Sequence, residues 1–247
     1  NLETLWPTEL EYLHLLRQIE TNAIEADLGF CKEKIDIGLD IMAECRKELG
    51  FNPGSSIDLN KFLIEDLKLP VVRRSPKTQK PSFDKKAMEI YDEILAKDNR
   101  REAQWVLTYR GWQKATSSLY ESIVKLVSPD GRVRPNFNIN GTKTGRLSCE
   151  EPNLQQIPRE SVNPWNGDAK GAFIPHDGFR LIVFDYSQLE FRLATAYGRD
   201  AELLEAFSQG LDVFLPIATS VFGSVDYRQH AKTLVYSTLY GAGIPRI

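Results

Sequence analysis

Residues 180–192 read Arg-Leu-Ile-Val-Phe-Asp-Tyr-Ser-Gln-Leu-Glu-Phe-Arg, a short apolar run that ends at a carboxylate. The run Arg180–Phe184 predicts a buried strand, and the stretch from about Gln188 to Tyr197 predicts a helix directly after it. An aspartate between a strand and a helix is well placed for a divalent metal, because Mg²⁺ takes one or two protein carboxylates and fills its other positions with water and phosphate oxygens. Asp185 could equally be a helix N-terminal residue.

Around this stretch, the two halves of the chain have different patterns. Residues 1–127 carry apolar side chains at helical spacing, which predicts a helical first half packed around its own core. The second half begins with the turn signal Ser128-Pro129-Asp130-Gly131 and then mixes strand and helix patterns. Strands are predicted over 133–139, 173–175 and 180–184, and helices over 188–197, 201–208 and 226–240. The predicted fold class is α+β.

The composition is that of an ordinary soluble globular chain. The 247 residues are 42% hydrophobic and 26% charged, which excludes a wholly disordered protein. No apolar run approaches the ~20 residues of a membrane span, so we expect no membrane partner. Cys31, Cys45 and Cys149 form no C-x-x-C pair, so we interpret them as buried free thiols in a reducing compartment. The cytoplasm of a bacterial or phage-infected cell fits this, and an organelle stays open.

Positive charge is concentrated in one segment, although the net charge of the chain is −3. Between residues 68 and 86 the only acid is Asp84. The basic side chains there are Lys68, Arg73, Arg74, Lys77, Lys80, Lys85 and Lys86. The segment is either a solvated loop or a patch that contacts phosphates.

A second informative segment joins Thr142-Lys143-Thr144-Gly145-Arg146-Leu147-Ser148 to Pro152-Asn153-Leu154-Gln155-Gln156-Ile157-Pro158. Small residues and a glycine allow a partner to approach the backbone closely. The arginine and the amide side chains supply donors that can reach base edges and sugars. By its chemistry alone, the segment could also be a structured surface loop.

A third segment places Arg228, Lys232, Tyr236 and Tyr240 four residues apart. At ~100° per residue each step drifts by only ~40°, so the four side chains follow one slowly turning stripe of a helix. A cationic turn suits a triphosphate, and aromatic faces further along suit a sugar and a base. A solvated basic turn followed by buried tyrosines is the alternative.

In this order, the three segments resemble the motifs of the family A (polymerase I-like) DNA polymerases. T-x-T-G-R-L-S with P-N-L-Q-x-I-P resembles the primer-template motif, D-Y-S-Q-L-E-F-R resembles motif A, and R-x-x-x-K-x-x-x-Y-x-x-x-Y-G resembles motif B. The resemblance implies a truncated right-hand architecture. Its expected parts are a helical thumb over 1–127, a partial antiparallel palm sheet over 128–200 and the start of helical fingers over 201–247.

The resemblance implies DNA-directed DNA synthesis, with nucleotidyl transfer from a dNTP to a primer 3′-hydroxyl. Two Mg²⁺ ions are expected in the complete enzyme, with Asp185 and the carbonyl of Tyr186 as metal ligands. Arg228 and Lys232 would grip the triphosphate, and Lys232 is also a candidate proton donor to pyrophosphate.

The same resemblance assigns the sugar and base contacts of the dNTP. Glu190 would be the steric gate where a ribose 2′-hydroxyl must go. Tyr240 would pack beside the incoming base pair and hydrogen-bond Glu190. The Tyr236 hydroxyl would stand in for a missing sugar 3′-hydroxyl, so dideoxynucleotides should be accepted.

Primer-template DNA is the second expected partner. By resemblance, Arg146 would reach the minor groove at the primer end, beside Thr144. Asn153 and Gln155 would contact the duplex. The basic segment falls in the expected thumb, which favours the interpretation that it contacts DNA phosphates.

Two departures from the family pattern stand out. Asp212-Val213-Phe214 replaces the usual D-I-H, so a phosphate-contacting histidine is a phenylalanine here. Motif C, with the second catalytic aspartate, is expected beyond Ile247, so the chain is expected to be an interior segment that is inactive alone. Asp177 and Asp200, or Asp212 itself, could in principle supply that carboxylate, but none lies in a matching motif. A single-subunit RNA polymerase and a non-catalytic primer-template-binding module are the alternatives.

Overall fold

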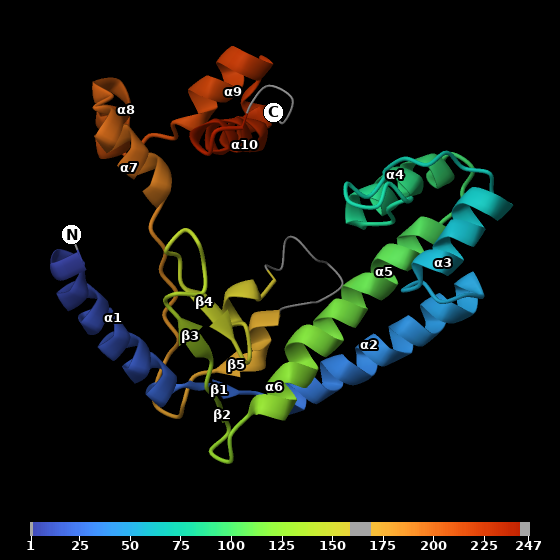
Figure 1. Ribbon diagram of the computed structural model, residues 1–247, viewed down its shortest axis with the longest axis horizontal. Helices are drawn as coiled ribbons and strands as arrows, with labels where there is room; N and C mark the ends of the chain where they lie inside the picture. Colours follow the sequence, from blue (N-terminus) through green and yellow to red (C-terminus); the bar gives the residue numbers. More distant parts are fainter. Residues whose placement is uncertain (1, 159–168, 243–247) are drawn as a thin grey trace. The chain divides into compact units, whose positions relative to one another are not determined.

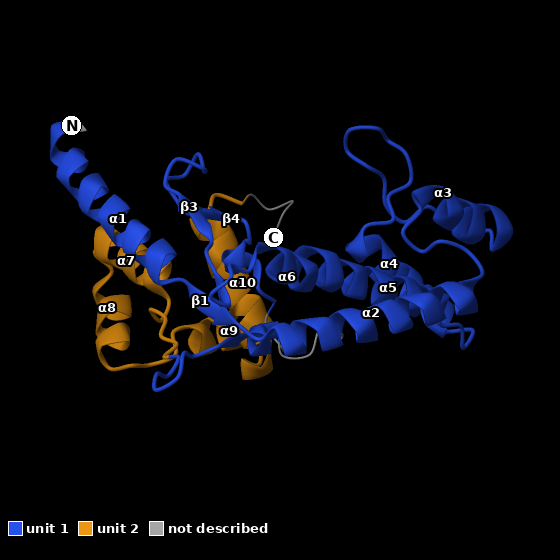
Figure 2. Cartoon of the chain, turned by 90° about the horizontal axis from the view of Figure 1, so that it is seen from below, with its two compact units in different colours: residues 1–181 blue, residues 182–247 orange. Residues whose placement is uncertain are grey.

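The structure, a computed structural model, describes residues 2–158 and 169–242 (Figure 1). The chain forms two compact units, residues 1–181 and residues 182–247, which Figure 2 distinguishes by colour. Each unit is described by itself below.

The first unit is built mainly from helices with well-defined ends. α1 spans Leu2–Asn22 and α2 spans Leu28–Leu49. The Asp27 carboxylate caps α2 by accepting a hydrogen bond from the Phe30 N–H at 2.8 Å. Gly50 ends the helix with φ of 71°, a left-handed conformation that glycine adopts readily. Gly50 therefore marks the end of α2.

The remaining helices of this unit flank the basic segment. α3 (Ser56–Leu59) continues into a π-helical stretch, and α4 spans Lys85–Ala96. Ser55 caps α3 by accepting a hydrogen bond from the Asp58 N–H at 3.2 Å, and Asp58 itself lies inside the helix. Asp84 caps α4 through the Ala87 N–H at 2.9 Å.

One long helical segment then crosses the unit. α5 (Glu102–Ala115) passes through a π-helical stretch, Thr116–Tyr120, into α6 (Glu121–Leu126). α2 packs against α5 and α6, and α4 packs against α5. The core between α4, α5 and the α3 region is built around Leu59, Leu63, Met88 and Tyr91, all nearly fully buried. A second core joins α2, α6 and the small sheet.

Two small antiparallel sheets complete the first unit. β1 (Ile24–Ala26) lies between β2 (Arg132–Val133) and β5 (Phe173–Ile174), giving the order β2-β1-β5. Ile24 pairs with Val133, and Ala26 pairs with Phe173. β3 (Asn136–Asn138) and β4 (Ser148–Glu150) form a hairpin in which Phe137 pairs with Cys149. β1 and β4 were not predicted as strands.

The strand predicted over Arg180–Phe184 is not present. A turn lies directly before these residues, in which the Phe179 N–H donates to the His176 carbonyl at 2.9 Å. Residues 180–184 pair with no strand among the described residues, and Ile182 and Phe184 are 82% and 87% exposed. A strand needs a neighbouring strand to satisfy its backbone hydrogen-bonding groups. The strand that precedes this run in the chain, β5, pairs with β1 and not with residues 180–184.

The second unit consists of four α-helices in its described part. They are α7 (Leu189–Gly198), α8 (Ala201–Ser208), α9 (Phe214–Phe222) and α10 (Arg228–Leu239). The predicted helices correspond to α7, α8 and α10, whereas α9 was not predicted. Buried aromatic side chains fill the core of this unit, with Phe191, Phe207 and Phe214 at its centre.

The predicted α+β class is confirmed, with helices dominating and short strands pairing in antiparallel fashion. The functional boundaries expected at residues 127 and 200 stay predictions. All three cysteines are buried free thiols, as expected. No helix in the described parts of the chain combines the length and apolarity that a membrane span needs.

Replacing Gly38 by alanine should destabilise the first unit. A Cβ at this α2 position would lie 2.5 Å from Thr116 Oγ1 and 2.9 Å from a Trp112 ring carbon. We expect the free energy of unfolding to fall by about 1–3 kcal/mol in urea titrations, as for other overpacked sites. Gly198→Ala is the matched control, since its Cβ meets nothing within 4 Å. Equal stability of Gly38→Ala and the wild type would contradict the close contact between α2 and α5.

Alkaline pH should destabilise the fold through Cys31. Burial, and secondarily Asp27, raise the pKa of this thiol from 9.0 to about 11. Between these values the native state holds a proton that the unfolded chain has lost, so the free energy of unfolding falls as pH rises, by at most about 1.4 kcal/mol per pH unit. Urea titrations from pH 8 to 11 should show a shallower decline for Cys31→Ala. The same slope in both proteins would refute this role.

Candidate functional site

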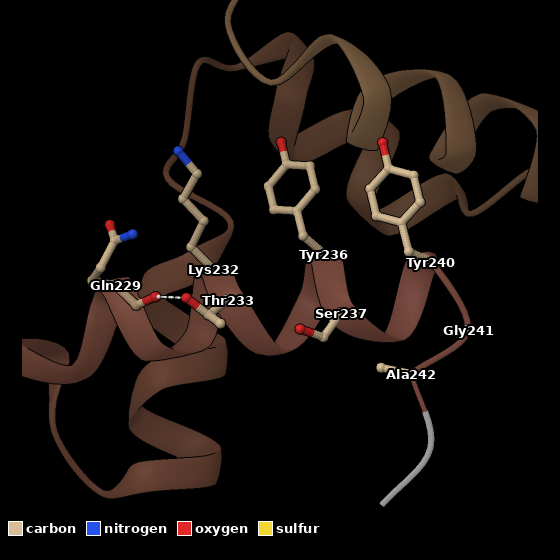
Figure 3. Close-up of a pocket in the computed structure, with 8 residues that line it drawn as sticks. All are labelled: Gln229, Lys232, Thr233, Tyr236, Ser237, Tyr240, Gly241 and Ala242. Carbon is tan, nitrogen blue, oxygen red and sulfur yellow. Dashed lines mark hydrogen bonds between the residues drawn. The ribbon is translucent and has the colours of Figure 1, made fainter. Parts of the chain in front are cut away.

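The predicted stripe of cations and tyrosines lies on α10. Arg228 is the first residue of the helix, and Tyr240 is the residue that follows its last turn. Figure 3 shows Lys232, Tyr236 and Tyr240 projecting from the same side of α10, in that order along its axis. Charge is therefore followed by two aromatic rings along one surface of the helix.

An open pocket of about 610 Å³ lies along this helix (Figure 3). Its residues come from three successive turns of α10 and from the chain just after it. They are Gln229, Lys232, Thr233, Tyr236, Ser237, Tyr240, Gly241 and Ala242. The pocket offers a cation at one end and a tyrosine at the other, which suits an elongated ligand with an anionic end and an aromatic end.

Glu190 of α7 reaches the aromatic end of the stripe. The Tyr240 hydroxyl donates a hydrogen bond to Glu190 Oε2 at 2.5 Å. The contact between these two side chains, expected from the resemblance, is therefore present. It fixes a carboxylate beside the ring at the end of α10.

Within the stripe, Tyr236 is partly buried. Its ring lies 6.5 Å from Phe191 and 6.3 Å from Phe214, measured between centroids. The Lys232 Nζ lies 6.0 Å from the Tyr236 centroid, within reach of a cation–π contact. Burial, together with the nearby Glu190 carboxylate, raises the pKa of Tyr236, so its hydroxyl keeps its proton and can donate a hydrogen bond.

Arg228 is held at the start of α10 by a residue outside that helix. Its Nε forms an ion pair with Asp212 Oδ2. Phe214, which stands where the family pattern has histidine, is fully buried in the core of the unit. The phenylalanine side chain therefore packs against its neighbours and offers no hydrogen-bonding atom at this position.

The candidate metal ligands lie in an extended, exposed segment. Asp185 is exposed, and Tyr186 is 75% exposed. Residues 2–158 and 169–242 contain no group of three histidine, cysteine or acidic side chains arranged for a metal ion. One carboxylate and one carbonyl fit part of a Mg²⁺ coordination shell, because this ion leaves most of its positions to water and phosphate.

The two halves of the predicted primer-template segment come together in the first unit. Residues 142–147 form the tip of the β3–β4 hairpin, where Gly145 has φ of 73°. The Thr142 hydroxyl donates to the Arg146 carbonyl at 2.6 Å, and Arg146 is exposed. The hairpin tip is thus a folded loop with an exposed arginine.

The second half of that segment braces the hairpin. Gln155 Nε2 donates to the Leu147 carbonyl at 3.2 Å. The Asn153 side chain accepts from the Gln155 N–H at 3.1 Å, which caps the short 3₁₀ helix Leu154–Gln156. Asn153 and Gln155 therefore shape the loop, whereas their predicted contacts with DNA stay predictions, as does the role of Thr144.

The basic segment is an exposed loop with internal order. The Ser75 N–H donates to the Lys80 carbonyl at 2.9 Å, and the backbones of Arg74 and Pro81 form an isolated antiparallel β-bridge. Arg73 lies 3.4 Å from Asp84, across the base of the loop. All the basic side chains of the segment lie on exposed residues. This arrangement presents several cations to solvent on one loop.

Asp212 is the residue of the site whose contact the sequence did not predict. It was considered only as a possible second metal carboxylate. The ion pair joins positions 16 residues apart on the loop before α9 and on α10. Only a correct prediction of α9 would have indicated that these positions meet.

Comparisons with known proteins identify the family of the chain. Residues 32–247 match the model of DNA polymerase family A. The chain is 30% identical over 249 residues to the thermostable DNA polymerase I of Thermus thermophilus, covering 94% of this chain and 29% of that protein. It is 31% identical over 255 residues to DNA polymerase I of Chloroflexus aurantiacus, covering 94% of this chain and 26% of that protein.

A solved structure extends the agreement to the fold. The POL domain of Pol1 from M. smegmatis, in complex with DNA primer-template and dNTP, matches with a TM-score of 0.82 at 27% identity. The match covers 95% of this chain and 42% of that one. The chain thus spans less than a third of the curated relatives named above. Since the family model matches most of the sequence, the chain belongs to DNA polymerase family A.

Proposed function

We propose that this chain takes part in template-directed DNA synthesis, in which a dNTP is added to a primer 3′-hydroxyl. The observation that carries the proposal is the stripe of Arg228, Lys232, Tyr236 and Tyr240, with Glu190 bonded at its end. The structural relative from M. smegmatis, solved in complex with DNA primer-template and dNTP, supports the same ligands.

In this proposal the cations of the stripe bind the triphosphate, and its tyrosines contact the base and the sugar. Arg228 and Lys232 bind the triphosphate, and Lys232 can pass a proton to the departing pyrophosphate. Tyr240 packs beside the incoming base pair. The Tyr236 hydroxyl is a donor to the sugar end. These roles come from the family resemblance, and the order of cation and ring along α10 supports them.

A divalent metal, most simply Mg²⁺, belongs to this reaction, with Asp185 and the Tyr186 carbonyl as its ligands in this chain. When bound, it would activate the 3′-hydroxyl and neutralise charge on the phosphates. The exposure of Asp185 leaves its carboxylate accessible to such a complex.

The first unit supplies the contacts to DNA in this proposal. Arg146 reaches the minor groove from the tip of the hairpin, and Thr144, Asn153 and Gln155 contact the duplex. The basic loop between residues 68 and 86 contacts backbone phosphates, because its cations are exposed.

Primer extension tests the proposal directly. Full-length protein should extend a labelled primer with Mg²⁺ and four dNTPs. Asp185→Asn should lower the rate at least about a hundredfold, because a metal ligand stabilises charge in the transition state. Retention of primer-template, measured in the same samples, should be unchanged.

The alternatives predict different results in that assay. Retention without extension by the wild type would identify a primer-template-binding module with no chemistry of its own. Equal extension with rNTPs would favour an RNA polymerase. Unchanged extension by Asp185→Asn would remove the metal role of this residue.

Sugar selection tests the steric gate. Glu190→Ala should reduce discrimination against rNTPs by about tenfold or more, since the carboxylate no longer fills the space of a 2′-hydroxyl. Tyr240→Phe keeps that carboxylate but removes the hydroxyl that holds it at 2.5 Å, so a smaller loss is expected. The measurement is the ratio of kcat/KM for dNTP and rNTP. The same ratio in the wild type and Glu190→Ala would contradict the gate.

A further inference from the structure

Asp212 joins the beginnings of two helices with a single carboxylate. Its Oδ1 accepts a hydrogen bond from the Phe214 N–H at 3.0 Å, at the start of α9. Its Oδ2 forms the ion pair with Arg228 Nε, at the start of α10. Both oxygens are therefore engaged, one in holding the loop and one in holding the guanidinium.

The ion pair uses only one of the three guanidinium nitrogens of Arg228, Nε. A guanidinium has five N–H donors in a planar fork, and pairing through Nε leaves the two terminal nitrogens outside the contact. Those terminal nitrogens are the ones that can bind a phosphate in bidentate fashion. Asp212 thus restrains Arg228 through Nε and leaves its two terminal guanidinium nitrogens outside the contact.

The Phe214 ring limits the guanidinium from another side. Arg228 Cζ lies 5.6 Å from the Phe214 centroid. Phe214 is itself fully buried and stacks on Phe191 at 5.8 Å with an interplanar angle of 19°. A ring packed in this way forms a fixed wall, so Arg228 is restrained by an ion pair and by a rigid surface.

We propose that Asp212 is a positioning residue that aims the guanidinium of Arg228 at the triphosphate of the incoming dNTP. This inference rests on the proposed function. It assigns the carboxylate a role in nucleotide affinity, acting through Arg228 and not by touching the substrate. Arg228 then meets the triphosphate with little loss of side-chain freedom, because its conformation is already fixed.

Two possible roles of Asp212, repulsion by its charge and positioning of Arg228, predict opposite changes in dNTP affinity when the carboxylate is removed. A carboxylate close to a triphosphate repels it, so an aspartate acting only through its charge would weaken dNTP binding. Removing that charge would then tighten binding. Positioning predicts the opposite, since an unrestrained Arg228 binds phosphate less well.

The variants separate the two hydrogen-bonding duties of Asp212. Asp212→Asn keeps a carbonyl oxygen that can accept from the Phe214 N–H, but its amide nitrogen cannot accept from Arg228 Nε. The matched control is Asp226→Asn, which removes the same charge two residues before Arg228. Asp226 is exposed and accepts from the Ser224 hydroxyl at 2.8 Å.

Single-turnover incorporation by the full-length protein measures the dissociation constant of the dNTP separately from the incorporation rate. For Asp212→Asn we expect that constant to rise about tenfold, because a charge-assisted contact to Arg228 is lost. The thermal midpoint and primer-template affinity should stay at wild-type values, and Asp226→Asn should behave as wild type. An unchanged or lower constant for Asp212→Asn would overturn the proposal, as would an equal rise for Asp226→Asn.

Arg228→Ala distinguishes this inference from the proposed function. If Arg228→Ala leaves the dNTP dissociation constant unchanged, the proposed triphosphate role of Arg228 fails. If Arg228→Ala weakens binding but Asp212→Asn does not, only the positioning role fails. In the Arg228→Ala background, Asp212→Asn should add less than a twofold further loss, because positioning acts through Arg228. Additive losses would indicate a general structural effect and refute the proposal.

Discussion

The stacked contact between Phe191 and Phe214 is the interaction on which the second unit depends. The two rings lie 5.8 Å apart, and Tyr236 lies within 6.5 Å of both, so this contact joins α7, α9 and α10. Glu190 precedes Phe191 in the chain, and Tyr240 lies one turn beyond Tyr236. The aromatic core therefore determines where the Glu190 carboxylate meets the Tyr240 hydroxyl.

Phe214 also shows how a buried ring can change the chemistry of a neighbouring site. Burying a phenylalanine side chain contributes about 1.5–3 kcal/mol, whereas a buried histidine needs partners for its ring nitrogens. Phenylalanine at this position favours packing and gives up a hydrogen-bond donor. Among the described residues, Lys232 of α10 supplies the cation that lines the pocket, and Arg228 packs over the Phe214 ring. The residue type at this one position thus affects both the packing of the core and the surroundings of Arg228.

The sequence predicted the local features of the fold because local rules determine them. Gly50 ends α2 and Asp84 begins α4, as their residue types indicate. The strand predicted over Arg180–Phe184 failed because strand formation depends on a distant partner. α9 was missed because its segment, Phe214–Phe222, is apolar almost throughout and contains a proline. Periodicity gives little signal in such a segment.

The same division between local and distant contacts applies to the site. Spacing alone placed Arg228, Lys232, Tyr236 and Tyr240 on one stripe, but it could not tell which carboxylates face them. Glu190 was expected there by resemblance. Asp212 was considered only as a possible metal ligand, and Asp200 likewise. In the structure Asp200 caps α8 through the Leu203 N–H at 3.1 Å, and Asp212 engages both of its oxygens. Asp200 thus serves as a helix cap and Asp212 as an anchor for Arg228, and neither belongs to a group of three metal-binding side chains among the described residues.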